Sequence, residues 1–554
     1  MKILKKGIVL FIASIVMISS LIGCTPSESE EVQAPSVDNL GELPEKFDNE
    51  VTITTVRHMN GDVLFRDGET IEDNVHTRWV KDKFNINLKY LWTTSGPQDA
   101  FKTKIRLELS SNQELPDLIA LRDDDVARDL INSGKFMEVG EVYEKYASPT
   151  WKAAMGEDPS VWYPYSRDGK KMGIPILDYS YNGDPVLWIR EDWLQKLNLE
   201  APKTLADLEK VMDAFVNQDP DGNGQKDTYG LTLGFKNNVN TWMSDTSWVF
   251  GMFGTVPRQW NIASDGTLEY GSIHPGAKQA LGTIKSWMEK GYIHKESALW
   301  DEIKASELFT SGMAGIIAGP HWMPHWPLPD LAKNVPGAEY KAYPIPAGPD
   351  GKVGRHGTQN FNGVVLINKN ISPESLKAFF VYQNYLFENY ANPAEGGEFQ
   401  YGMFEGYDYV MKDGKGIPNE EDDRIDPVKY TLTFDGARIP SLTMTTLAKL
   451  GRGEEPSTPY ERVHALHPKA VAQAALVVLE QKDASKKDAF LGGTTPTMVT
   501  RIEALNTMEK EHYNNIIYGK TSIDEFDSFV EQWKSAGGQK IIEEVNEWYK
   551  KVTQ

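Results

Sequence analysis

The chain has 554 residues and a formal net charge of −21, and 40% of its residues are hydrophobic while 25% are charged. This composition is that of an ordinary globular protein, and the acidic balance argues against binding to nucleic acid or, by charge, to anionic lipid. The length predicts two lobes or more, because one hydrophobic core seldom organises so many residues.

The N-terminus predicts an export signal. Three lysines precede an apolar stretch at 7–20, which is too short to be a good membrane-spanning helix. The stretch ends in Leu21-Ile-Gly-Cys24, which resembles a bacterial lipobox. We therefore expect residues 1–23 to be removed and Cys24, the only cysteine, to carry palmitate or a similar lipid. An ordinary secretory signal with an incidental cysteine is the alternative.

Residues 24–50 predict a flexible tether between this anchor and the folded protein. The segment is rich in Ser, Pro and Glu, and Phe47 is its only aromatic residue. Such a composition buries too little apolar surface to offset the entropy of ordering the chain. The protein is thus expected on the extracellular face of the cell membrane, held there only by its lipid.

Strand and helix patterns alternate from residue 51 onward. Strands are predicted at 51–56, 86–92 and 115–121, with helices at 74–84 and 100–109. The alternation indicates a mostly parallel α/β sheet, whose ligands bind beyond the carboxyl ends of the strands. The polar residues that follow the first and third strands are Arg57, His58, Asn60, Asp123 and Asp124.

A second unit is predicted to begin near Tyr181. Its expected elements are a strand at 185–190, an amphipathic helix from Thr204, a strand within 308–319, a strand at 363–368, a helix at 372–390 and a helical tail.

The segment 219–227 has the spacing of an EF-hand-type calcium loop. Oxygen side chains stand at positions 1, 3, 5 and 9, Gly224 supplies the sharp turn at position 6, and position 7 can offer a backbone carbonyl. Position 12 is Gly230 instead of the usual glutamate, so we predict a structural Ca²⁺ and not a calcium sensor. A metal-free turn is the alternative. The predicted ligands are Asp219, Asp221, Asn223, Gln225 and Asp227.

Tryptophans gather in segments that lack helical periodicity, among them Trp248, Trp322 and Trp326. Indole faces in a cleft suit the C–H faces of sugar rings, although most large aromatic side chains pack in a core. Catalytic motifs give no comparable signal: there is no Gly-x-Ser-x-Gly, no His-Glu-x-x-His and no phosphate-binding glycine loop.

Several motifs together resemble the extracellular solute-binding lipoproteins of carbohydrate ABC importers. They are the lipobox at Cys24, Gly173-Ile-Pro-Ile176, Leu187-Trp-Ile-Arg-Glu-Asp-Trp-Leu194, Pro202-Lys-Thr-Leu205, the calcium loop with Asp227-Thr-Tyr-Gly230, Glu525-Phe-Asp-Ser-Phe-Val530 and Glu544-Val-Asn-Glu-Trp-Tyr549. The chain is similar to lipoproteins of polysaccharide-using Gram-positive bacteria and, more distantly, to alginate-oligosaccharide-binding proteins. Those relatives carry a calcium loop that matches the five predicted ligands.

The resemblance implies an α/β, two-lobed periplasmic-binding-protein-like fold of type II, with the ligand held in a cleft between the lobes. It places the first lobe at 51–181 and 356–440, and the second at 182–355 and 441–554. The crossings between the lobes are expected near 179–185 and 355–362.

We therefore predict a monomeric, lipid-anchored receptor, not an enzyme, that captures an oligosaccharide and delivers it to an ABC permease. A surface glycosidase or polysaccharide lyase is the alternative, and a purely structural surface lipoprotein is a third. The predicted ligand-binding residues are Arg57, His58, Asn60, Asp123, Asp124, Tyr179, Tyr181, Trp248, Trp322, Trp326, Phe361 and Asn362.

Overall fold

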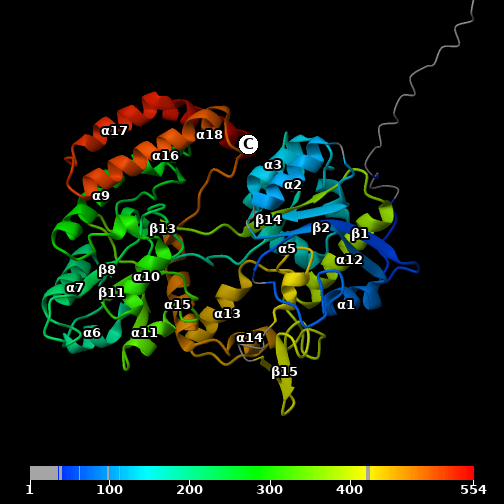
Figure 1. Ribbon diagram of the computed structural model, residues 1–554, viewed down its shortest axis with the longest axis horizontal. Coiled ribbons are helices and arrows are strands. Elements are labelled where there is room, and N and C mark those ends of the chain that lie inside the picture. Colours follow the sequence, from blue (N-terminus) through cyan, green and yellow to red (C-terminus); the bar gives the residue numbers. More distant parts are fainter. Residues whose placement is uncertain are drawn as a thin grey trace, which may run out of the picture.

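The computed structural model describes residues 35, 40–61, 63–96, 99–111, 113–419 and 425–553. The predicted signal peptide, Cys24 and much of the predicted tether lie outside these residues. The described chain forms two lobes that lie side by side and are joined by extended segments (Figure 1). Within this part of the chain, no helix is both long and apolar enough to cross a membrane.

The first lobe combines a parallel pair of strands with a three-stranded sheet of order β3-β14-β6. Its strands are β1 (Val51–Met59), β2 (Ile86–Ser95), β3 (Leu118–Leu121), β6 (Ile174–Leu177) and β14 (Phe361–Ile367), with short hairpins β4 (Ser166–Arg167) to β5 (Lys170–Lys171) and β15 (Tyr409–Lys412) to β16 (Lys415–Pro418). Its helices are α1 (Val75–Phe84), α2 (Asp99–Ser110), α3 (Asp124–Asn132), α4 (Gly140–Tyr146), α5 (Pro149–Gly156) and α12 (Pro373–Asn389).

The second lobe is built on a four-stranded sheet of order β12-β7-β11-β8. Its strands are β7 (Val186–Arg190), β8 (Tyr229–Thr232), β9 (Trp260–Ile262), β10 (Leu268–Tyr270), β11 (Ala314–Gly319), β12 (Tyr340–Tyr343), β13 (Arg355–His356) and β17 (Ser485–Lys486). Its helices are α6 (Glu191–Lys196), α7 (Leu205–Asn217), α8 (Ser247–Gly251), α9 (Pro275–Glu289), α10 (Glu302–Thr310), α11 (Pro329–Asn334), α13 (Leu442–Gly451), α14 (Pro459–His464), α15 (Lys469–Glu480), α16 (Pro496–Ile517), α17 (Glu525–Trp533) and α18 (Gln539–Thr553).

Two expectations about the strands were wrong in detail. The sheets are mixed: β1–β2 and β11–β8 are parallel, whereas β14 runs antiparallel to β3 and β6, and β7 runs antiparallel to β11 and β12. Each of the strands β7 and β14 directly follows a crossing between the lobes. The chain therefore enters each sheet from the side that faces the other lobe. The strand predicted to end at residue 56 also continues to Met59, because β1 stays paired with β2 as far as Ser95.

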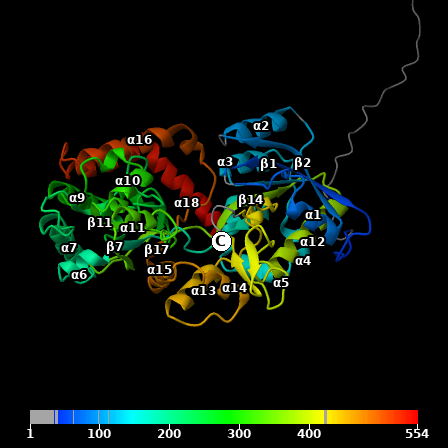
Figure 2. The ribbon, with the colours of Figure 1, turned by 60° about the horizontal axis from the view of Figure 1, so that its bottom comes forward.

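Separate hydrophobic cores show how the chain passes between the lobes. Buried residues from Leu40 to Leu177 share a core with residues from Val365 to Ala437. A second core joins Leu187–Ile345 to the tail between Met498 and Val545, and a third joins the same lobe to helices α13 and α15. The chain therefore passes between the cores three times: after β6, before β14 and before α13. Figures 1 and 2 both show α13 and α14 between the lobes.

A fully buried ion pair ties the first two crossings together. The Arg355 Nε and the Asp184 Oδ2 lie 3.1 Å apart, and both side chains are 0% exposed. The backbone N–H of Thr358 donates to the other Asp184 oxygen at 3.0 Å, and Arg355 also donates to the carbonyl of Val478 at 3.1 Å. Because a buried charge needs its partner, this pair fixes how the crossings lie against each other.

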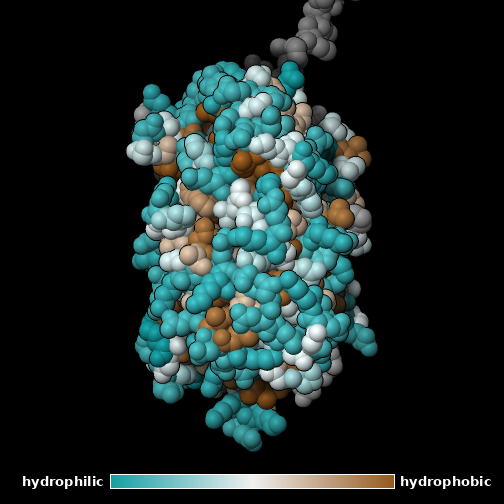
Figure 3. Space-filling model, turned by 90° about the vertical axis from the view of Figure 1, so that its left-hand side faces the viewer, coloured by the Kyte–Doolittle hydropathy of each residue, from teal (hydrophilic) through white to brown (hydrophobic). Residues whose placement is uncertain are grey.

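The outer face of the second lobe is hydrophilic for the most part. At the end of the molecule that carries α6 and α7, hydrophobic residues appear only as small, separate patches (Figure 3). This distribution agrees with the acidic composition of the chain.

Candidate ligand-binding site

A cavity of about 310 Å³ lies at the carboxyl ends of β1 and β3 in the first lobe. It brings together four of the residues predicted from the sequence, namely Arg57, His58, Asn60 and Asp123. The other polar and aromatic lining residues are Phe101, Arg122, Lys429, Phe434 and Asp435. We call this space the strand-end cavity. Its wall combines hydrogen-bond donors, carboxylates and an aromatic ring, which is a suitable set for a polyhydroxylated ligand.

Arg57 is held in place by the backbone of the returning segment. Its side chain is buried, and its guanidinium donates to the carbonyls of Thr431, at 2.9 Å, and of Lys429. The guanidinium carbon lies 4.8 Å from the centre of the Phe434 ring. The charge also affects its surroundings: burial, together with the Arg57 charge, lowers the pKa of His76 to about 3. His76 is therefore neutral at physiological pH.

A chain of opposite charges leads from the strand-end cavity to the first crossing. Arg122 forms an ion pair with Asp435, whose second oxygen lies 3.1 Å from Arg438. Arg438 is also paired with Asp178, and its guanidinium carbon lies 4.3 Å from the centre of the Tyr179 ring. The cavity wall is thus connected through side chains to the segment that joins the lobes.

Three tryptophans of the second lobe form a partly exposed stack. The Trp242 ring stacks on both Trp322 and Trp326. Its centre lies 5.8 Å from that of Trp322, at an interplanar angle of 24°, and 6.0 Å from that of Trp326, at an angle of 22°. Trp326 is 44% exposed and Trp242 is 36% exposed. The Trp322 indole N–H donates to the carbonyl of Asn182 at 2.9 Å, so the stack lies next to the first crossing.

Trp248 does not belong to this surface. Its side chain is 0% exposed, packs 6.3 Å from Trp287 between ring centres, and donates its indole N–H to the carbonyl of Asp245 at 2.9 Å. The short helix α8 carries it into the core of the second lobe. The expectation that Trp248 stacks on a ligand is therefore corrected: it is a packing residue.

The remaining predicted residues lie around the crossings. The Asp124 carboxylate accepts a hydrogen bond from the Tyr165 hydroxyl at 3.0 Å, and Phe361 packs edge-on against the same tyrosine. Asn362 is half-buried in β14. Tyr181 has a backbone φ of +61° and lines a different, larger cavity. These four residues do not line the strand-end cavity.

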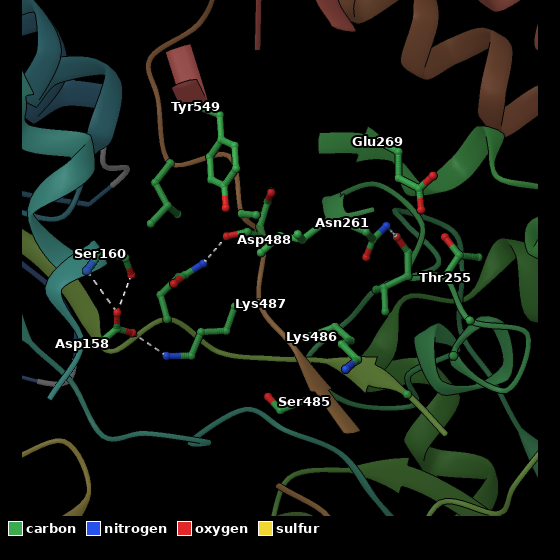
Figure 4. Close-up of a pocket in the computed structure, with 18 of the residues that line it drawn as sticks. Asp158, Ser160, Thr255, Asn261, Glu269, Ser485, Lys486, Lys487, Asp488 and Tyr549 are labelled. Carbon is green, nitrogen blue, oxygen red and sulfur yellow. Dashed lines mark hydrogen bonds and ion pairs between the residues drawn. The ribbon is translucent and has the colours of Figure 1, made fainter. Parts of the chain in front are cut away.

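The larger cavity has a volume of about 620 Å³ and lies between residues of both lobes. Figure 4 shows Asp158 and Ser160 on one side, Thr255, Asn261 and Glu269 on the other, and the segment from Ser485 to Asp488 between them. Lys487 lies 2.8 Å from Asp158, and Asp488 accepts the backbone N–H of Trp260 at 3.0 Å. Adjacent side chains of this segment therefore bind opposite lobes.

The Asp488 carboxyl should make stability depend on pH. Burial raises its pKa from 3.8 to about 6, so the folded protein holds this proton more tightly than the unfolded chain. Its contribution to the free energy of unfolding is fully present below pH 3.8 and is lost as the pH rises through 6. In urea unfolding between pH 4 and 7, Asp488→Asn should lose stability less steeply with rising pH than the wild type. Equal slopes would contradict this assignment.

The predicted calcium loop folds as a tight turn on the second lobe, after α7. Asp219 accepts the backbone N–H groups of Gly222 at 3.0 Å and Gly224 at 3.1 Å. The amide nitrogen of Asn223 donates to Asp221 at 2.8 Å and to both oxygens of Asp227 at 3.2 Å. Across the described residues, no three His, Cys, Asp or Glu side chains are arranged to hold a metal ion.

Sequence reasoning missed the returning segment from Lys429 to Arg438 and the middle tryptophan of the stack. The segment lies about 370 positions after Arg57 in the sequence and carries no motif, yet it forms part of the cavity wall. The available signal was chemical: Phe434-Asp435-Gly436-Ala437-Arg438 places aromatic, acidic and basic groups in one short irregular stretch.

Comparisons with known proteins identify the family of the chain. The family of bacterial extracellular solute-binding proteins matches residues 63–384. The polygalacturonan/rhamnogalacturonan-binding protein YtcQ of Bacillus subtilis (strain 168) is 24% identical over 488 residues, which are 84% of this chain and 86% of YtcQ.

Two solved structures share the fold. The alginate-binding protein AlgQ2, solved without calcium ion, has a TM-score of 0.58 at 19% identity, with 92% of this chain and 100% of AlgQ2 covered. An EF-hand mutant of the S. pneumoniae ABC-transporter substrate-binding protein FusA, in complex with fructo-nystose, has a TM-score of 0.59 at 18% identity, with 91% and 99% covered. The chain belongs to the family of bacterial extracellular solute-binding proteins.

Proposed function

We propose that this protein is the receptor of an ABC importer and that it captures an oligosaccharide between its lobes. The observation that carries the proposal is that the first lobe has a polar strand-end cavity, while the second has a partly exposed tryptophan stack next to the first crossing. Aromatic faces cover the C–H faces of sugar rings, and the cavity supplies hydrogen bonds to hydroxyl groups. YtcQ is a polygalacturonan/rhamnogalacturonan-binding protein, AlgQ2 is an alginate-binding protein, and FusA was solved in complex with fructo-nystose; these relatives support the same class of ligand.

The proposed lobes are 51–181 with 356–440, and 182–355 with 441–554. The three core passages after β6, before β14 and before α13 support the boundaries between the lobes. The outer boundary at 51 needs a correction: Leu40 and Phe47 of the predicted tether are buried in the core of the first lobe, so the folded part begins by residue 40. A ligand that contacts both lobes favours the closed arrangement, because only closure lets it make both sets of contacts. The permease would then recognise the closed, loaded receptor.

The proposed receptor is held at the cell surface by lipid on Cys24. Its sequence Leu21-Ile-Gly-Cys24 supports the modification, and the extracellular family agrees with a position outside the cytoplasm. The family is one of binding proteins, so we propose binding without turnover. New fragments released from a panel of plant and algal oligosaccharides would contradict this and favour a surface glycosidase or lyase.

A thermal-shift screen tests the proposed function directly. Ligands that bind only the folded protein raise its melting temperature, and the rise grows with the logarithm of the ratio of ligand concentration to Kd. We expect at least one oligosaccharide of three or more units to raise it, and monosaccharides to do so less. If no oligosaccharide shifts the melting temperature, the protein is not an oligosaccharide receptor.

The loop from Asp219 to Asp227 is proposed to hold a structural Ca²⁺. Its donor set fits the ion: burial and the neighbouring carboxylates raise the pKa of Asp221, and the Asn223 amide nitrogen donates to Asp221 and Asp227. A cation would relieve the repulsion between these carboxylates, and the Asn223 side chain would turn its oxygen toward the ion. FusA has been solved as an EF-hand mutant and AlgQ2 in a form without calcium ion, and both support the same assignment.

Removal of calcium should destabilise the protein without changing its ligand contacts. We expect a chelator to lower the melting temperature, because metal that binds only the folded state stabilises it. The Asp221→Ala variant should start from a lower melting temperature and no longer respond to the chelator. Asp265→Ala, in an exposed turn elsewhere on the second lobe, should respond as the wild type does. An unchanged melting temperature after verified metal removal would contradict the site.

A further inference from the structure

A further cavity between the lobes lies against the tail helix α18. Its volume is about 800 Å³, and it shares no lining residue with the strand-end cavity or the tryptophan stack. The first lobe contributes α3, α4, α5, the hairpin β4–β5 and the 3₁₀ helix η2 (Pro159–Tyr165), and the second lobe contributes residues 493–494 and the end of α18. We call this space the tail cavity. A ligand in it would contact both lobes.

The lining of the tail cavity is basic, although the chain as a whole carries a net charge of −21. Its carboxylates are Glu144 and Asp168, and its cations are Arg128, Lys152, Arg167, Lys171 and Lys551. Five cations against two carboxylates give the lining a formal charge of +3. A concave surface that gathers one sign of charge focuses the electrostatic field and attracts ions of the opposite sign. The composition of the lining therefore favours an anion.

Arg167 has no ion-pair partner among the described residues. Its hydrogen bonds go to the backbone carbonyls of Pro164, at 3.1 Å, and Ser166, at 2.7 Å, and both use the Nη1 atom. Burial and the nearby Arg128 charge lower the pKa of Arg167 by more than Asp168 raises it. An anion beside the two guanidinium groups would offset their repulsion, and the Nε and Nη2 atoms of Arg167 are left to donate to it.

The protein also uses only part of the Arg128 side chain. Its Nη1 atom donates to Asp125 at 3.1 Å and to the Thr494 hydroxyl at 2.9 Å. The Asp125 side chain is 68% exposed, so water screens this ion pair. A Cβ at Gly493 would lie 2.5 Å from the Arg128 Nε, so the absence of a side chain at Gly493 lets the arginine reach the second lobe. Arg128 thus joins the two lobes and still has donors for a ligand.

Aromatic rings line the same cavity. Tyr163 of the first lobe and Trp548 of the second meet edge-on, with ring centres 6.3 Å apart, and both side chains are half-buried. The Lys171 ammonium lies 4.3 Å from the centre of the Trp162 ring. Aromatic rings cover the C–H faces of sugars, while guanidinium groups bind carboxylates and phosphates. The two sets together fit a sugar that carries a negative charge.

We propose that the tail cavity is a second ligand site, which binds an acidic sugar through its carboxylate or phosphate group. The anionic group lies beside Arg128 and Arg167, and the sugar ring lies against Tyr163 and Trp548. Lys551, which is exposed near the end of α18, adds its charge from the second lobe. The inference goes beyond the proposed function and does not depend on it, because the strand-end cavity and the tryptophan stack share none of these residues.

Isothermal titration at low ionic strength with three small probes tests this. Digalacturonate carries carboxylates, glucose 6-phosphate carries a phosphate, and galactobiose is the neutral match of the first probe. We expect at least one acidic probe to bind about tenfold more tightly than galactobiose, with an affinity that falls as salt is added. Tighter binding of digalacturonate assigns the site to a uronate, and tighter binding of glucose 6-phosphate assigns it to a phosphorylated sugar.

Three variants place the binding in the tail cavity. Arg167→Gln should weaken binding of the acidic probe about tenfold, because a charge-assisted hydrogen bond is lost. Lys551→Gln, at an exposed side chain, should leave the fold intact and weaken binding by a smaller factor. Arg452→Gln, at an exposed guanidinium outside the cavity, should leave the affinity unchanged.

Either of two results overturns the inference. In the first, no acidic probe binds more tightly than galactobiose, and in the second, binding is indifferent to both Arg167→Gln and Lys551→Gln. The two proposed sites fail separately. Trp326→Ala should weaken binding of the oligosaccharide found in the thermal-shift screen and leave the acidic probe unaffected, whereas Arg167→Gln should do the reverse.

Discussion

Replacement of Trp326 with alanine is expected to weaken oligosaccharide binding by about 1–3 kcal/mol, or about 5- to 150-fold in Kd. Trp326 is the most exposed ring of the tryptophan stack, and its neighbour Trp242 supports it from behind. Removal of the indole takes away an apolar face without opening a core. The melting temperature without ligand should therefore change little, while titration of the ligand found in the screen should show the loss.

Two matched variants separate stacking from packing. Trp79→Ala, at a half-buried ring on α1 that donates to Glu398 within the first lobe, should leave Kd unchanged. Trp248→Ala should lower the free energy of unfolding by about 3–5 kcal/mol, because a fully buried indole leaves a cavity in the second lobe. If Trp326→Ala binds ligand as the wild type does, the stack is not part of the ligand surface.

Replacement of Asp184 with alanine is expected to cost about 3–5 kcal/mol of the free energy of unfolding. Asp184 and Arg355 are both 0% exposed, so the substitution leaves a buried guanidinium without its ion-pair partner. The Thr358 N–H also loses its acceptor. Urea unfolding of the purified protein, followed by tryptophan fluorescence, measures the change.

The double variant Asp184→Ala with Arg355→Met provides the control. Removal of both charges should recover part of the lost stability, because no uncompensated charge then remains in the hinge. Asp527→Ala removes an exposed partner of Lys278 and should cost no more than about 1 kcal/mol. If Asp184→Ala is as mild as Asp527→Ala, the buried pair does not stabilise the hinge.

The sequence predicted the part of the site that depends on local pattern. The residues Arg57, His58 and Asn60 follow a β-branched run, and Asp123 follows another, so the rule for strand ends placed them together. The contact of these residues with Phe434 and Asp435 in one cavity could not be predicted, because it depends on how the returning segment folds over β1. It also depends on the backbone φ of +69° at Phe434, a conformation that a phenylalanine in the sequence does not predict.

The tryptophans show a different limit of sequence reasoning. Trp248 and Trp322 both lie in sequence segments without helical periodicity, yet Trp248 is in the core and Trp322 is only half-buried. The difference comes from their elements: α8 is a buried single turn, whereas prolines keep the loop after β11 irregular at the surface. The identity of a side chain does not say which side of its backbone faces water.

The three passages of the chain between the two lobes have a consequence for resistance to proteolysis outside the cell. Extracellular proteases cut preferentially where a connecting segment is exposed. A single cut in any one passage leaves the lobes joined by two intact covalent links, and the buried Asp184–Arg355 pair still holds the first two passages together. A nicked molecule therefore keeps both lobes on one particle.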